Sequence, residues 1–109
     1  MENKDFTKAV NKRLKDFEPA LNTLSGVDRI LAEDLSREYC QVCVQSAEIQ
    51  ERINETGYTV LSAQGSSVKN PDVATKHQLI QEKVSIAPKL VKLFKDGGVG
   101  DDELSKFLG

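Results

Sequence analysis

The chain has 109 residues, of which 39% are hydrophobic and 29% are charged, and its formal net charge is −2. This length suits one domain with a modest core, and the composition is that of a globular or helical-assembly protein. No apolar run approaches the roughly 18 residues of a membrane span. Residues 1–17 are charged throughout, unlike a secretory signal, so we expect an intracellular protein.

Residues 3–18 have the spacing of an amphipathic helix that ends at Pro19. One face of this helix is apolar: Phe6, Val10, Leu14 and Phe17. A second row is basic: Lys4, Lys8, Lys12 and Lys15, with Arg13 oriented elsewhere. We predict that these basic residues bind nucleic-acid phosphates without reading the base sequence. The alternative is a solvated helix face, which charge runs commonly form.

A second, longer helix is predicted to begin at the capping stretch 25–28 and to continue to Thr56, where Gly57 ends it. It is about 42 Å long, and so short a chain has little left with which to cover it. We therefore expect a homo-oligomer. The residues predicted to pack in the core or against a second copy are Leu35, Tyr39, Val42, Ile49 and Ile53.

Cys40 and Cys43 form a C-x-x-C within that helix, a spacing shared with redox pairs and half zinc sites. The chain has no second cysteine pair and a single histidine, His77, so a zinc site lacks a complete ligand set. We favour two small buried helix residues. No catalytic residue, metal or cofactor is predicted. A C-x-x-C redox enzyme is the enzymatic alternative, although no strand precedes Cys40.

Residues 58–69 have a different pattern. Residues 58–61 are rich in strand formers, and residues 64–67 (QGSS) are typical of a turn. A short β-hairpin or an ordered loop is predicted, and the pattern does not choose between them. Lys69, at the end of this stretch, is a further candidate for DNA binding.

The tripeptide Asn70-Pro71-Asp72 predicts a helix start. Asn is a strong N-cap, Pro suits the first helical position, and Asp favours the positive end of a helix. Apolar residues then repeat at helical spacing as far as Pro88, which is predicted to end or kink the helix. A last amphipathic turn or two follows, up to Lys95.

We predict one helical domain at residues 1–96, followed at 97–109 by a flexible joint and an acidic tail. Residues 101–108 are expected to form a short amphipathic helix. Its apolar side chains are candidates for docking into a groove of a partner: Leu104, Phe107 and Leu108. The alternatives are a frayed terminus and a helix packed on its own chain.

Residues 27–94 resemble the small subunit of phage DNA-packaging terminases, in the compact family found in tailed phages and prophages. The resemblance lies in the order of elements and in three motifs: ETG at 55–57, VKNP at 68–71, and VSIAP at 84–88, which is similar to the family's L-G-L-T/S-P element. The chain departs from the family at Ser85 and Ala87, which stand where Gly and Ser or Thr are usual. Val91 and Lys92 stand where the family usually has an Arg.

The resemblance implies a non-catalytic protein of the bacterial host cytoplasm. Such a protein binds double-stranded viral DNA at the packaging start site. It recruits and regulates the large terminase subunit, which has ATPase and nuclease activity. The implied fold is mainly α, with a long central helix, a helical hairpin and a small β-hairpin or ordered loop, assembling as an oligomeric ring. The alternative is a small helical oligomeric adaptor or structural protein that binds only proteins.

Overall fold

The computed structural model describes residues 3–61 and 63–108, apart from the side chain of Phe107. The elements in chain order are α1 (Asn3–Leu14), the 3-10 turn η1 (Lys15–Phe17), α2 (Glu18–Leu21), α3 (Gly26–Thr56), β1 (Thr59–Leu61), β2 (Ser67–Lys69), α4 (Pro71–Asp96) and α5 (Asp101–Leu108). The molecule is elongated, with extents of 56 × 26 × 23 Å. The predicted mainly helical fold with a small β element is confirmed.

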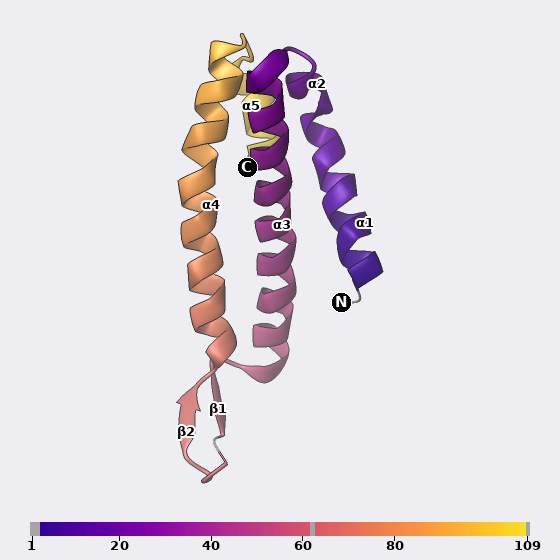
Figure 1. The fold of residues 1–109 in the computed structure, drawn as a ribbon. Helices are drawn as coiled ribbons and strands as arrows, with labels where there is room; N and C mark the ends of the chain where they lie inside the picture. Colours follow the sequence, from indigo (N-terminus) through magenta and orange to yellow (C-terminus); the bar gives the residue numbers. More distant parts are fainter. Residues whose placement is uncertain (1–2, 62, 109) are drawn as a thin grey trace.

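The long helix α3 is the centre of the molecule. Figure 1 shows α4 running antiparallel along one side of α3 and α1 lying along the other side. The predicted interface residues Tyr39, Val42, Ile49 and Ile53 are at most 7% exposed, and Leu35 is half-buried. These residues are therefore core residues of a single chain. Our argument that α3 lacked a cover was wrong, because α4 packs along it.

The first predicted helix is shorter than its pattern suggested. α1 ends at Leu14, the 3-10 turn follows, and Pro19 lies in the first turn of α2. Proline suits that position because the first N–H groups of a helix have no partner within the helix. The bend turns Phe17 into the core, where its ring centroid lies 6.2 Å from that of Tyr39 and 6.4 Å from that of Phe94.

Thr59–Leu61 and Ser67–Lys69 pair as a β-hairpin, which was one of the two predicted alternatives, the other being an ordered loop. Its strands are antiparallel, and Val60 stands opposite Val68. The hairpin projects from the end of the helical layer (Figure 1). Gly65, at its tip, has a φ of +84°, which L side chains rarely adopt.

Pro88 does not end α4, which continues to Asp96. Ile86 and Leu90, on either side of Pro88, are both buried, so packing holds the helix together across the proline. After Gly97 the chain turns back. Val99 and Leu104 are each 5% exposed and belong to the same core as the rest of the bundle.

Candidate nucleic-acid interface

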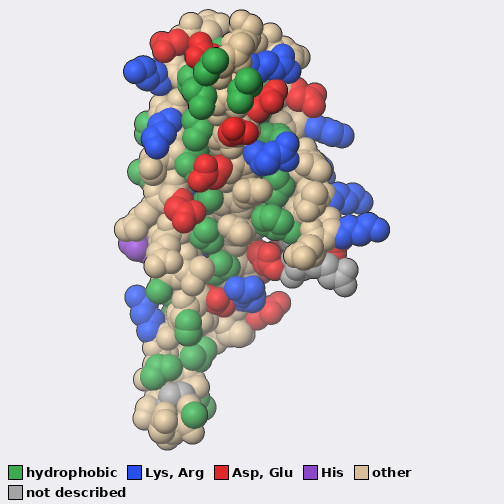
Figure 2. Space-filling view, in the orientation of Figure 1, with side chains coloured by type: hydrophobic (Ala, Val, Ile, Leu, Met, Phe, Trp, Pro, Cys, Tyr) green, Lys and Arg blue, Asp and Glu red, His purple; other side chains and the backbone are tan. Residues whose placement is uncertain are grey.

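The predicted basic row lies on the outer surface of the N-terminal segment. Lys4, Lys8 and Lys12 on α1 and Lys15 in η1 are exposed. They line one shallow hollow together with Asp5, Thr7 and Asn11. Figure 2 shows basic side chains projecting from the edge of the molecule that α1 forms. The structure thus brings these four lysines together, along about 16 Å of helix.

The lysines point outward because the other face of α1 is apolar and packs on α3. Val10 is 3% exposed, and Phe6 and Leu14 pack partly buried against the core. The amphipathic spacing of α1 therefore sets both its attachment and the direction of its charges. The hollow is lined by four lysines and by the acidic residue Asp5. Its local charge is therefore positive, although the chain as a whole is negative.

Arg13 does not belong to this outer row. It is half-buried, and its Nε atom is buried without a hydrogen-bond partner among the described residues. Its charge acts on Tyr39 and Cys40, lowering the pKa of each, although burial outweighs this effect in both. Arg13 is thus directed toward α3, away from the lysine row, as the helical spacing predicted.

Lys69 is likewise separated from the row. It ends β2, opposite Thr59, in the hairpin that projects beyond the helices. Figure 1 shows this hairpin below α4, with α1 on the opposite side of α3. A single chain therefore presents Lys69 and the α1 lysines as two separate basic positions.

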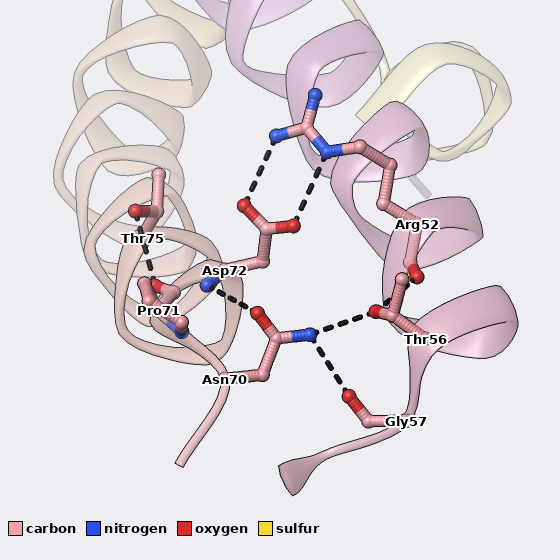
Figure 3. Close-up of polar contacts among 7 residues, drawn as sticks. All are labelled: Arg52, Thr56, Gly57, Asn70, Pro71, Asp72 and Thr75. Atoms are coloured by element: carbon pink, nitrogen blue, oxygen red, sulfur yellow. Dashed lines mark hydrogen bonds and ion pairs between the residues drawn. The ribbon is translucent and has the colours of Figure 1, made fainter. Parts of the chain in front are cut away.

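The hairpin has a defined direction because polar contacts clamp its base (Figure 3). The Asn70 side chain accepts a hydrogen bond from the Asp72 backbone N–H at 3.0 Å, which is the predicted N-cap. The same side chain donates to the Thr56 hydroxyl at 2.9 Å and to the Gly57 carbonyl oxygen at 2.8 Å. Asn70 is 5% exposed, so these bonds satisfy a buried amide.

An ion pair next to this clamp was not predicted from the sequence. The Arg52 guanidinium donates to both carboxylate oxygens of Asp72, at 3.1 and 3.2 Å. This pairing raises the pKa of Arg52 above its usual value. The two residues are 20 positions apart, and no spacing rule within one helix brings them together. Only the antiparallel return of α4 along α3 does so.

The C-x-x-C residues lie inside the helical layer. Cys40 is buried and Cys43 half-buried, and both are free thiols. Burial raises the pKa of Cys40 to about 11, so its thiol is protonated at neutral pH, which is the poorly nucleophilic form. Within the part of the chain that the structure describes, no three His, Cys, Asp or Glu side chains gather closely enough to hold a metal ion.

Of the predicted docking residues of the tail, Leu104 and Leu108 face inward. Leu104 is buried in the core, and Leu108 is half-buried and packs against it. The side chain of Phe107 lies outside the described residues. The structure therefore places α5 on its own chain, which was one of the alternatives for this segment.

The apolar side chains that remain exposed differ from those that we predicted to face a second copy. On α3 they are Val27, Ile30 and Leu31, and on α4 they are Ile80 and Val84, all at least 42% exposed. In the hairpin, Tyr58, Leu61 and Val68 are at least 40% exposed. Exposed apolar groups of this kind mark contact surfaces in many proteins.

Comparison with known proteins leaves the family open. No family model, curated protein or solved structure matches the chain. The terminase resemblance rests on the motifs quoted above and stays a prediction. Among the described residues, no helix is long and apolar enough to cross a membrane.

Proposed function

We propose that the protein is the small subunit of a phage DNA-packaging terminase, which binds double-stranded viral DNA and recruits and regulates the large ATPase–nuclease subunit. The observation that carries the proposal is the exposed row of four lysines on α1 and η1, held outward by the buried apolar face. The order of long helix, β-hairpin and Asn-Pro-capped helix supports it.

The chemistry of this interface is neutralisation of phosphates. Lysine ammonium groups on one helix face release counterions from DNA and do not read base edges. With four contacts, one chain has a salt slope of about −3.6 in log K against log salt. Such binding is weak for a single chain. Repetition of the row around a ring adds the contacts as avidity, and the proposal therefore includes a homo-oligomeric ring in the cytoplasm of the bacterial host.

The test compares two triple variants that lose the same charge. Lys8, Lys12 and Lys15 are changed together to Gln, and the control changes the exposed Lys89, Lys92 and Lys106 to Gln. Affinity for a random-sequence duplex is measured by fluorescence anisotropy over a range of salt concentrations. We expect the first variant to lose affinity and to flatten the slope by roughly 0.9 per lysine, with a smaller change in the control. Equal slopes in the two variants would remove α1 from the DNA site.

An adaptor that binds only proteins is the second candidate function, and the exposed apolar residues of α3, α4 and the hairpin favour it. Absence of any salt-sensitive DNA binding by the wild type would select the adaptor. Native mass spectrometry tests the ring: a closed assembly of many copies supports it, and a monomer at all concentrations removes it.

A further inference from the structure

The outward side of α4 carries a second row, apolar except for His77 and distinct from the one that packs on α3. Its members alternate at intervals of four and three residues: Val73, His77, Ile80, Val84, Ala87 and Val91. This alternation is the spacing of a seam between two helices that wind around each other. The core-facing residues Ile86, Leu90 and Phe94 follow a separate line on the same helix.

This outer row is incompletely covered by its own chain. Val84 is 65% exposed, Ile80 is 42% exposed and His77 is exposed. Ala87 and Val91 are half-buried and touch the edge of the core. The row thus borders the core along its C-terminal part and opens to solvent in its middle, where Ile80 and Val84 lie.

The spacing of the row is symmetric about Glu82. Ile80 and Val84 lie two residues from it, His77 and Ala87 five residues, and Val73 and Val91 nine residues. In an antiparallel pair of α4 helices, Ile80 of one copy therefore meets Val84 of the other. The ring of His77 meets the small side chain of Ala87. An interface formed by one patch with itself requires this kind of self-complementarity.

Because few charges flank the row, two copies can approach each other along it without strong electrostatic repulsion. The neighbouring outward positions Ala74, Gln81, Ser85 and Pro88 are uncharged, and the exposed Lys92 follows them at the C-terminal end of the row. On the inward side, the ammonium group of Lys76 donates to the Gln50 side chain, and that of Lys83 lies 5.5 Å from the centre of the Tyr39 ring. Both lysines are thus directed toward α3, away from a helix on the outer row. A strongly charged partner would find little complementary charge here.

We propose that a second copy of this chain docks on the α4 row. The two α4 helices run antiparallel and are related by a two-fold axis at the level of Glu82 along the helix. The row spans about 27 Å of helix, and a contact one helix wide along that length buries less than the roughly 800 Å² per partner of a standard interface. The pair is therefore weak and forms with rising concentration. A two-fold contact joins only two copies, so a larger ring needs a second kind of contact. The exposed residues Val27, Ile30 and Leu31 are available for it.

The first test is sedimentation velocity of the full chain over a concentration series. Val84→Glu introduces a carboxylate without a partner at the centre of the contact and is expected to weaken self-association about a hundredfold. Gln78→Glu adds the same charge at an exposed position of α4 outside the row and should leave association unchanged. Equal melting curves of the two variants show that folding is intact, as the exposure of Val84 predicts. A wild type that stays monomeric, or unchanged association of Val84→Glu, overturns the proposal.

The second test reads the register. Ile80→Cys and Val84→Cys chains are mixed and oxidised, and disulfide-linked dimers are measured on a non-reducing gel, with the wild type as the background for Cys40 and Cys43. The antiparallel pair predicts more cross-linking in the mixture than in either variant alone, because residues 80 and 84 face each other. Stronger cross-linking within a single variant contradicts the two-fold register. DNA binding enters neither test, so both are independent of the proposed DNA-binding role. A wild type that stays monomeric would also remove the proposed ring, whereas unchanged association of Val84→Glu, or the wrong cross-linking pattern, would overturn the α4 contact alone.

Discussion

The hydroxyl of Tyr39, in the middle of α3, donates a 3.1 Å hydrogen bond to the carbonyl oxygen of Leu108 in the last turn of α5. Tyr39 is completely buried, and its ring also meets Phe17 edge-on and lies beneath the ammonium group of Lys83. One side chain thus contacts the N-terminal segment, α4 and the C-terminal helix. Burial raises the pKa of Tyr39 to about 12.

The raised pKa values of Tyr39 and Cys40 predict loss of stability in alkali. In the unfolded chain these groups lose their protons near pH 10 and pH 9, whereas in the folded chain the pKa values are about 12 and about 11. Between pH 9 and 12 the folded state therefore holds more protons than the unfolded state, so the free energy of unfolding falls as the pH rises. Urea unfolding at a series of pH values measures this slope.

The variant Tyr39→Phe isolates the tyrosine's share. At neutral pH it should cost about 1 kcal/mol through the lost hydrogen bond, and it should make the fall between about pH 10 and 12 shallower. Tyr58→Phe is the matched control, because Tyr58 is 64% exposed, and it should leave the stability at neutral pH unchanged. An alkaline slope identical to that of the wild type would show that Tyr39 is not protected in the folded state.

Asn70 is expected to hold both the start of α4 and the base of the hairpin. Asn70→Ala removes the cap on Asp72 and the two bonds donated to Thr56 and Gly57, and should cost about 2 to 3 kcal/mol. Asn70→Ser keeps a capping oxygen and should recover about 1 kcal/mol. Chemical denaturation measures the cost, and amide hydrogen exchange locates it. If Ala and Ser cost the same, the cap contributes nothing.

Gly97 is expected to allow close packing against Leu24 where α4 ends. A Cβ atom at this position would overlap Cδ2 of Leu24, which is 7% exposed in the turn before α3. Gly97→Ala should therefore lower stability by about 1 to 3 kcal/mol. Gly100→Ala is the control, because a Cβ there meets no atom within 4 Å. Thermal melting compares the two, and equal melting temperatures would contradict the close packing at Gly97.

Local features of the structure were largely predictable. The apolar spacing indicated the long helices, and Asn70-Pro71-Asp72 located the start of α4 and its cap. The lysine row was predicted and is exposed on one face of the N-terminal segment. These features depend on interactions between residues within about four positions of one another, which a pattern in one chain reveals.

The sequence by itself determined the helices, the turn chemistry and the direction of the α1 lysines, because each follows from the period of a helix or from a backbone preference. Only the tertiary structure decided which apolar faces are covered. It buried Tyr39 and Ile53, left Ile80 and Val84 exposed, and paired Arg52 with Asp72. The physical reason is that a helix with apolar residues on several sides has more than one way to pack, and the antiparallel return of α4 along α3 chooses among them.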